Sequence, residues 1–225
     1  MPKCKSSFAK EILAWHKKNN RNYLSWRETS DPYKILVAEV LLQKTDAPKV
    51  NQIYSEFIKE YPDVTSLSKT SVEAIRGVIK PLGLYHHRSH RLKKMALQII
   101  ERHRGSIPDK KKDLMGLKGV GEYTSNAVLC FGFKRDVPLI DTNFVRVFSR
   151  ILGYNSKKTR PWTDAKLWEF AEDVIPNGKA KEFNWAVLDF ASLICRARNP
   201  KHDICPFQRY CVYYQSLKME SHLDR

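Results

Sequence analysis

The sequence lacks any apolar run that approaches the roughly 20 residues needed to cross a membrane. Its first segment, MPKCKSSFAKEILAWHKK, is charged too regularly to be a secretory signal peptide. Acidic residues are also scarce, because 24 Asp and Glu stand against 40 Lys and Arg, which gives a formal charge of +16 and a pI near 9.7. We therefore expect a soluble, non-secreted protein whose partner is a polyanion.

Strand-like alternation, internal repeats and low-complexity linkers are missing as well. Apolar residues instead recur at helical spacing along most of the 225 residues, and a hydrophobic content of 42% is enough for a substantial core. The predicted fold class is all-α, with about ten short helices whose ends are defined to within a few residues. The segments expected to be helical are 6–19, 31–45, 47–61, 71–79, 88–103, 111–117, 122–133, 142–152, 163–175 and 181–195.

Two of these segments carry clear start signals. Ser6 precedes an apolar helix face and is expected to cap the first helix. Asp31 and Pro32 occupy the cap and first-turn positions of the second. The second helix is apolar from 35 to 42 except for Glu39, so we expect Glu39 to be buried, with a raised pKa that would let it donate a proton.

The stretch LKGVGEYTSNAV, residues 117–128, predicts a tight glycine turn followed by a helix. Such a turn lets the backbone approach a large ligand, and the free N–H groups at the start of the following helix suit phosphate. An ordinary helix-turn-helix junction is the alternative. Nine basic residues against two acidic ones between Arg88 and Lys112 favour a phosphate backbone as the ligand.

Five cysteines, an odd number gathered mostly near one end, argue against a disulfide framework. They indicate a metal or cluster site in a reducing compartment. Asp141 follows the apolar run VPLI and precedes a helix, where an aspartate is most often an N-cap. From the residues alone, capping is therefore the first interpretation of Asp141.

The order of five features resembles the helix-hairpin-helix DNA glycosylases of the endonuclease III superfamily. These features are DPYKILVAEVLLQKT, PLGLYHH, LKGVGEYTSNAV, LIDTNFVRV and a C-terminal cysteine cluster. The resemblance extends over nearly the whole chain, from about Trp26 to Tyr214. The resemblance implies two helical domains with the active cleft between them. A six-helix, barrel-like domain with the hairpin is expected over 30–140, and a cluster-containing domain over 1–29 plus 141–225.

The resemblance also implies catalytic roles. The acid at the position of Asp141 stabilises the sugar cation or activates water as the base leaves, and Asn143 holds this carboxylate or a phosphate, or only caps the helix. Strand-cleaving relatives have a lysine at the position of Tyr123, and a phenol cannot form their Schiff base. Relatives that process thymine or uracil opposite guanine have tyrosine here, where it stacks on a flipped pyrimidine, although plain packing is the alternative. The role of Glu39 is open between a contact to the base edge and a bound water.

Further positions match the DNA-contacting parts of the family. Gln43 and Lys44 resemble the loop that fills the void left by the flipped base, while Leu84 and Tyr85 resemble the wedge on the opposite side. Each of these could also be plain packing. The remaining residues expected to contact DNA are His86, Lys118, Gly119, Val120 and Gly121.

The segment CRARNPKHDICPFQRYC resembles the cluster loop C-x6-C-x2-C-x5-C of the superfamily, with histidine in second place. The expected ligands are Cys195, His202, Cys205 and Cys211. An imidazole can replace one thiolate, so a [4Fe-4S] cluster with Cys3His ligation is expected. Zinc is the second choice, since Cys3His is also a zinc set, and an empty site is the third.

Together these features predict a monofunctional DNA N-glycosylase that removes thymine or uracil opposite guanine in base excision repair. The partner is double-stranded DNA containing a mismatch, and the protein is expected to be a cytoplasmic, nucleoid-associated monomer. Adenine removal opposite guanine or 8-oxoguanine is the rival activity. Relatives with that activity carry a further C-terminal domain, which we do not expect here because the chain ends about fifteen residues past the cluster. A non-catalytic binder of distorted duplex is the rival from another class, and Asp141 argues against it because a pure binder has no use for a carboxylate near phosphates.

Overall fold

The structure is a computed structural model that describes the backbone of residues 2–223 and the side chains of residues 5–219. Over this range it contains helices and no strand, which confirms the all-α prediction. No helix in the described part combines the length and apolar character that a membrane span requires. The chain divides into two compact units, and each is described by itself. Unit 2 is Asn22–Arg135, and unit 1 combines the chain up to Arg21 with the chain from Asp136 onward.

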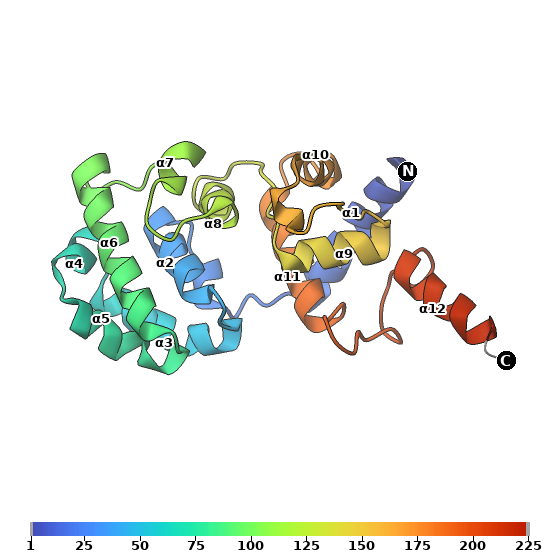
Figure 1. The fold of residues 1–225 in the computed structure, drawn as a ribbon, viewed down its shortest axis with the longest axis horizontal. Coiled ribbons are helices and arrows are strands. Elements are labelled where there is room, and N and C mark those ends of the chain that lie inside the picture. The colour runs from blue at the N-terminus through green and yellow to red at the C-terminus, as the bar shows by residue number, and fades with distance from the viewer. Residues whose placement is uncertain (1, 224–225) are drawn as a thin grey trace. The chain divides into compact units, whose positions relative to one another are not determined.

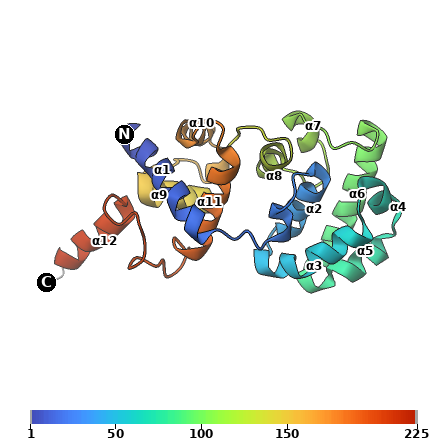
Figure 2. The same ribbon diagram turned by 180° about the vertical axis from the view of Figure 1, so that it is seen from behind.

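Unit 2 is built around one buried helix, α2, which packs against α3, α6, α8 and η3. Its helices (Figure 1) are η1 Ser25–Arg27, α2 Pro32–Leu42, α3 Ala47–Glu60, α4 Val64–Lys69, α5 Val72–Ile79, η2 Lys80–Leu82, α6 Tyr85–His103, α7 Lys111–Met115, α8 Glu122–Ala127 and the π-helix η3 Val128–Gly132. The long helix α6 runs beside α4 and α5 in both views (Figures 1 and 2).

The start of α2 follows the expected local chemistry. The carboxylate of Asp31 accepts hydrogen bonds from the backbone N–H groups of Tyr33 at 2.8 Å and Lys34 at 3.4 Å, and Pro32 occupies the first turn. The side chains from Ile35 to Leu41 are all buried, Glu39 among them with an exposed fraction of 6%. The prediction that Glu39 is buried is therefore confirmed.

Unit 1 is a bundle held together by aromatic rings. Its helices are α1 Pro2–Asn19, α9 Thr142–Leu152, η4 Pro161–Thr163, α10 Ala165–Val174, α11 Ala180–Leu193 and α12 Val212–Leu223. Phe8 of α1 is fully buried and meets Phe148 of α9, Phe183 of α11 and Phe207 with ring centroids 5.2–6.3 Å apart. The pairs with Phe148 and Phe183 are edge-to-face and the pair with Phe207 is tilted, and aromatic pairs at such distances stabilise a core beyond their buried area. The segment after α11, which carries Phe207, is thereby fixed to the bundle.

Several expected helix ends were wrong. Ser6 does not cap α1, because the backbone is already helical from Pro2, a residue that a first helical turn tolerates. Helix α6 begins at Tyr85 rather than Arg88, directly after Leu84 in a left-handed conformation. Two helices, α4 and α12, were not predicted.

Candidate functional site

The hairpin between α7 and α8 makes its turn at Gly119, whose φ of +85° favours glycine. A Cβ on Gly119 would lie 2.0 Å from Cδ of Arg91, so the Arg91 side chain from α6 fills the space beside the turn. The backbone N–H of Lys118 donates to Oε1 of Gln98 at 2.7 Å, which fixes the hairpin to α6. By contrast, a Cβ on Gly121 would meet nothing within 4 Å, so the backbone there is open to a ligand.

The loop after α2 is joined to this hairpin. Nε2 of Gln43 donates to the carbonyl oxygen of Gly119 at 2.9 Å, and the Arg91 guanidinium donates to Oε1 of Gln43. The next residue, Lys44, has an exposed side chain and a left-handed backbone with φ of 58°. In this structure the Gln43 amide is therefore occupied by the hairpin, and Lys44 is the side chain that the loop presents.

The turn before α6 carries the second predicted DNA contact. Leu84 is 55% exposed, which is unusual for leucine, and its φ is 50°. Tyr85 and His86 follow in the first turn of α6, with their ring centroids 4.5 Å apart. Unit 2 thus collects the hairpin, the loop of Gln43 and Lys44, and the Leu84 turn around the N-terminal part of α6.

Tyr123 lies in the first turn of α8, two residues past Gly121, and is half-buried. Its place follows from the hairpin, because α8 begins immediately after the second glycine. Glu39 lies in the buried helix α2, which packs against α8.

Asp141 and Asn143 meet in unit 1, at the start of α9. Oδ1 of Asp141 accepts from the backbone N–H groups of Asn143 at 2.8 Å and Phe144 at 3.0 Å, and Oδ2 accepts from Nδ2 of Asn143 at 2.7 Å. Burial raises the pKa of Asp141, while the hydrogen bonds from Phe144 and Asn143 act in the opposite direction. The expected N-cap is therefore confirmed, and the cap geometry also fixes the direction of the carboxylate.

Arg146, which the sequence did not single out, continues this arrangement. One nitrogen, Nη2, donates to Oδ1 of Asn143 at 2.9 Å and to the carbonyl oxygen of Ala191 at 3.0 Å, while Nε donates to the carbonyl oxygen of Cys195 at 2.8 Å. A chain of hydrogen bonds thus runs from Asp141 through Asn143 and Arg146 to the backbone of Cys195. The signal in the sequence was small: Arg146 follows Asn143 by three residues and so shares its helix face.

The four predicted metal ligands line one small cavity of about 20 Å³ in the loop between α11 and α12. Arg150 braces this loop: its guanidinium donates to the carbonyl oxygen of Arg196 at 2.7 Å and approaches Sγ of Cys195 at 3.8 Å. Sγ of Cys211 donates to the carbonyl oxygen of Arg150 at 3.1 Å. Burial raises the pKa of the Cys205 thiol to about 11 and also raises the pKa of Cys211.

His202 lies in the same cavity wall, with its ring stacked at 5.0 Å on Tyr214 and at 6.0 Å on Tyr213. Three thiols and an imidazole are a soft donor set of the kind that iron–sulfur centres and zinc prefer. Within the described residues, however, no three Cys, His, Asp or Glu side chains are drawn into a metal-binding arrangement. The donor set suits an iron–sulfur cluster or zinc, and the four side chains line one cavity without forming a metal-binding arrangement.

The basic segment 88–112 is not a uniform phosphate-facing surface. Arg88 is buried, with an exposed fraction of 4%, and donates to two backbone carbonyl groups and one hydroxyl. Nζ of Lys93 donates to the carbonyl oxygens of Ser68 and Thr70. These two cations brace the fold of unit 2, so the nine basic residues of this segment do not all face a phosphate backbone.

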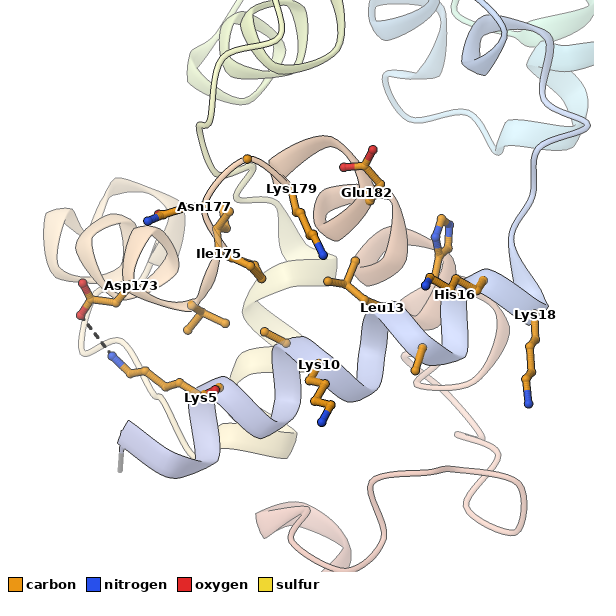
Figure 3. Close-up of a pocket in the computed structure, with 17 residues that line it drawn as sticks. Lys5, Lys10, Leu13, His16, Lys18, Asp173, Ile175, Asn177, Lys179 and Glu182 are labelled. Carbon is orange, nitrogen blue, oxygen red and sulfur yellow. Dashed lines mark hydrogen bonds and ion pairs between the residues drawn. The ribbon is translucent and has the colours of Figure 1, made fainter.

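A much larger cavity, of about 1310 Å³, lies elsewhere in unit 1, between α1 and the segment around the end of α10 (Figure 3). Lys5 reaches Asp173 across it at 3.3 Å, and Lys10, Lys18 and Lys179 lie around it. None of the predicted site residues lines this cavity.

Comparisons with known proteins agree with these features. Residues 37–173 match the family described as HhH-GPD superfamily base excision DNA repair protein, and residues 195–211 match the iron-sulfur binding domain of endonuclease III. The chain is 41% identical over 213 residues to the thymine/uracil-DNA glycosylase of Pyrobaculum aerophilum, covering 93% of each chain. It is 39% identical to the thymine-DNA glycosylase of Aeropyrum pernix, covering 92% of this chain and 94% of the relative.

The fold has a solved counterpart of similar extent. The structure of a thermostable thymine-DNA glycosylase matches with a TM-score of 0.89 and 36% identity, over 95% of this chain and 98% of that chain. The family match covers more than half of the sequence, and the identity to the relatives extends over nearly all of it. The chain therefore belongs to the HhH-GPD superfamily of base excision DNA repair proteins.

Proposed function

We propose that this chain is a monofunctional DNA N-glycosylase that removes thymine or uracil paired with guanine from double-stranded DNA. The observation that carries the reaction type is the half-buried Asp141 carboxylate, fixed by hydrogen bonds at the start of α9. The substrate class rests on the relatives named thymine-DNA and thymine/uracil-DNA glycosylase, which match over nearly the whole chain.

The geometry at Asp141 suits the chemistry of this reaction. The bond between C1′ of the sugar and the base nitrogen breaks, the oxygen of a water molecule bonds to C1′, and a proton of that water neutralises the departing base. Positive charge develops on C1′ and O4′, and a carboxylate already held in one direction stabilises it without reorganisation. Asn143 acts as the residue that orients Asp141, because its amide donates to Oδ2 at 2.7 Å.

Tyr123 supports hydrolysis without strand cleavage. A lysine amine in this place could attack C1′ and form an imine, whereas a phenol cannot. We assign to Tyr123 the stacking of the flipped pyrimidine, which fits a half-buried aromatic side chain directly after the hairpin. Buried Glu39 would contact the base edge or hold a water molecule.

The duplex contacts belong to unit 2. Exposed Leu84 would act as the wedge, with Tyr85 and His86 beside it, and the loop of Gln43 and Lys44 would face the position of the flipped base. The hairpin residues Lys118, Gly119, Val120 and Gly121 would approach the phosphate backbone, for which the open space at Gly121 leaves room.

The loop between α11 and α12 would hold a [4Fe-4S] cluster through Cys195, His202, Cys205 and Cys211. The cluster would cross-link a loop that otherwise contains little regular structure, and its role there is structural. Arg150 and Arg146 would support the first ligand from outside, through the contacts of their guanidinium groups to the loop backbone and to Sγ of Cys195.

Metal analysis of the purified protein tests this assignment. We expect a brown protein with iron and sulfide in about a four-to-four ratio. His202→Cys should keep the cluster, whereas Cys205→Ser should lose iron and lower the thermal stability. A colourless protein with one equivalent of zinc would replace the cluster by a zinc site, and a metal-free, folded and active protein would exclude both.

Single-turnover excision tests the proposed activity. Duplexes containing G·T, G·U, G·A and 8-oxoguanine·A are incubated with excess protein, and each sample is divided before treatment with alkali. We expect strand breaks from G·T and G·U only after alkali, because hydrolysis leaves an intact abasic strand. The matched control is Asp141→Asn, which should bind the same duplexes.

Each other outcome has a definite meaning. Preferred cleavage of the adenine-containing duplexes would make the protein an adenine glycosylase. Tight binding to mismatched duplex with no excision by the wild type would indicate a non-catalytic binder. Breaks before alkali would contradict the monofunctional assignment.

A further inference from the structure

Two turns of unit 2, the loop after α2 and the turn before α6, each contain a residue in the left-handed conformation that is not glycine. Lys44 follows Gln43 with φ of 58°, and Leu84 follows Gly83 with φ of 50°. For residues other than glycine this conformation costs about 1–2 kcal/mol, so other contacts must hold it. The two residues belong to the two segments that would enter the duplex.

One side chain holds both turns. Nη1 of Arg88 donates to the carbonyl oxygen of Gly83 at 2.7 Å, and Nη2 donates to the carbonyl oxygen of Gln43 at 2.8 Å and to Oγ1 of Thr45 at 2.9 Å. The two carbonyl groups belong to the residues that immediately precede the left-handed ones. A single guanidinium group thus joins two turns that lie about forty residues apart in the chain.

Burying the charged Arg88 side chain costs desolvation free energy. Its side chain is almost inaccessible to solvent, and the three acceptors are neutral. Burial and then the neighbouring charge of Arg91 lower the pKa of Arg88. A buried cation among neutral acceptors is a weak source of stability, which favours a role in fixing local geometry.

A second contact connects these turns to the hairpin. The amide of Gln43 donates to Gly119 and accepts from Arg91, which itself packs against the hairpin glycine. Arg91 follows Arg88 by three residues on α6, so one helix face carries both contacts. Lys44 and Leu84 are exposed, whereas the backbone beside them is joined by the hydrogen bonds of Arg88, Gln43 and Arg91. We call these hydrogen-bonded turns the frame.

We propose that Arg88 is a positioning residue for base flipping: it fastens the Lys44 turn and the Leu84 turn into one rigid element that meets the duplex as a unit. The proposal rests on the proposed glycosylase function. Arg88 acts through the exposed Lys44 and Leu84 and not by contacting DNA, because its guanidinium is turned inward to the three acceptors.

The test uses Arg88→Met, which keeps the length of the side chain without its donors, and Arg88→Lys, which keeps the charge. The matched control is Lys93→Met, since Lys93 lies on the same helix and also bridges backbone carbonyl groups, but those of Ser68 at the end of α4 and of Thr70 after it. Base flipping is followed by the fluorescence of 2-aminopurine placed next to the mismatched thymine, and excision by single-turnover kinetics.

We expect Arg88→Met to lower the excision rate from G·T by about 10-fold to 10²-fold, with an equal loss of the fluorescence change, because small displacements of positioning groups have effects of this size. Arg88→Lys should have an excision rate and a fluorescence change between those of the wild type and Arg88→Met. Lys93→Met should match the wild type in both measurements. A double-mutant cycle with Leu84→Ala separates positioning from general destabilisation. If Arg88 acts through Leu84, the double variant is hardly slower than the slower single variant.

The proposal would be overturned if the rate losses of the Arg88 variant and Leu84→Ala multiply in the double variant. It would also be overturned if Arg88→Met shows the same fluorescence change as the wild type. If Arg88→Met fails to fold, the same cycle with Arg88→Lys decides. The fluorescence change on binding does not require excision, so it tests Arg88 even if the wild type excises nothing, in which case the proposed function fails alone.

Discussion

Asp141 has a structural role as the N-cap of α9 and, in the proposed reaction, a chemical role as well. As N-cap it saturates the first N–H groups of α9, and these bonds favour its ionised form. Burial favours the neutral form and is the larger effect on its pKa. The proposed reaction requires a charged Asp141 in a site that disfavours charge, which predicts a conflict between activity and stability.

The first prediction measures this conflict. Asp141→Asn should lose about 10²-fold or more in excision, since one electrostatic group commonly supplies that much. The same variant should gain stability relative to the wild type as pH rises. An acid with a raised pKa in the folded state binds more protons when folded than when unfolded, so the wild type loses stability as pH rises from the ordinary carboxyl range through the raised pKa.

The measurement is the difference in free energy of unfolding between the two proteins from about pH 4 to about pH 8, with asparagine as a comparable cap. Asn143→Ala is the companion variant, because it leaves the carboxylate in place and removes the 2.7 Å bond to Oδ2. A stability difference independent of pH would show that the folded protein does not disfavour the charge of Asp141.

The second prediction concerns Tyr123. Borohydride should trap no covalent complex between the wild type and a G·U duplex, because no amine occupies the attacking position. Tyr123→Lys should introduce trapping, and Tyr123→Phe, which keeps the ring, should retain excision without it. Efficient trapping of the wild type would show that another amine attacks C1′.

The hairpin is an element in which the two glycines have different tasks. Gly119 provides a left-handed turn against the Arg91 side chain, whereas Gly121 has an ordinary φ of −101° and open space around it. The first glycine is thus required by the fold, and the second leaves room for a ligand.

The third prediction follows from this difference. Gly119→Ala should lower the free energy of unfolding by about 1–2 kcal/mol, because alanine is strained at positive φ and its Cβ displaces Arg91. Gly121→Ala should leave stability unchanged but weaken duplex binding, since the new methyl group occupies the open approach. Chemical denaturation and a binding titration of both variants separate the effects, and equal destabilisation by the two would contradict the assignment.

Local chemistry explains which elements could be predicted. Asp31 and Pro32 define the start of α2 because cap and first-turn preferences act over three or four residues. Helix α4 was missed although Asp63 and Ser66 form a capping box at its start, and the π-helix that continues α8 has no simple periodic signal. The early start of α6 depends on Leu84 being left-handed, a conformation held by the Arg88 side chain, which donates to the carbonyl oxygen of Gly83 and also to the loop after α2.

The same limit applies to the site. Asp141, Tyr123 and the ligand set could be named from motifs whose spacing along the chain is fixed. Arg88 and Arg146 could not, because a buried arginine that donates to carbonyl groups resembles any surface arginine in the sequence. Among nine basic residues of one segment, only the fold separates Arg88 and Lys93, which brace unit 2, from exposed cations such as Lys94 and Lys112.

At the scale of the whole molecule, the net charge of +16 predicts how binding responds to salt. Each phosphate neutralised by a cation contributes about −0.9 to the slope of log K against log salt concentration. A protein with six or more such contacts loses about 10³-fold or more in affinity between about 50 and 200 mM salt. We expect a fall of this size for a G·T duplex bound by Asp141→Asn, in which excision does not interfere.

The slope of log K against log salt concentration distinguishes cations that contact phosphates from cations that are bonded within the fold. Lys118→Ala should reduce its magnitude by about 1, because this exposed hairpin lysine would contact a phosphate. Arg88→Met, made in the same Asp141→Asn background, should weaken binding without changing the slope, since its guanidinium is committed to Gly83, Gln43 and Thr45 and releases no counterion. A slope that falls by about 1 for Arg88→Met would mean that this arginine leaves its buried contacts for a phosphate in the complex, and the frame of the two turns would then be rearranged on binding.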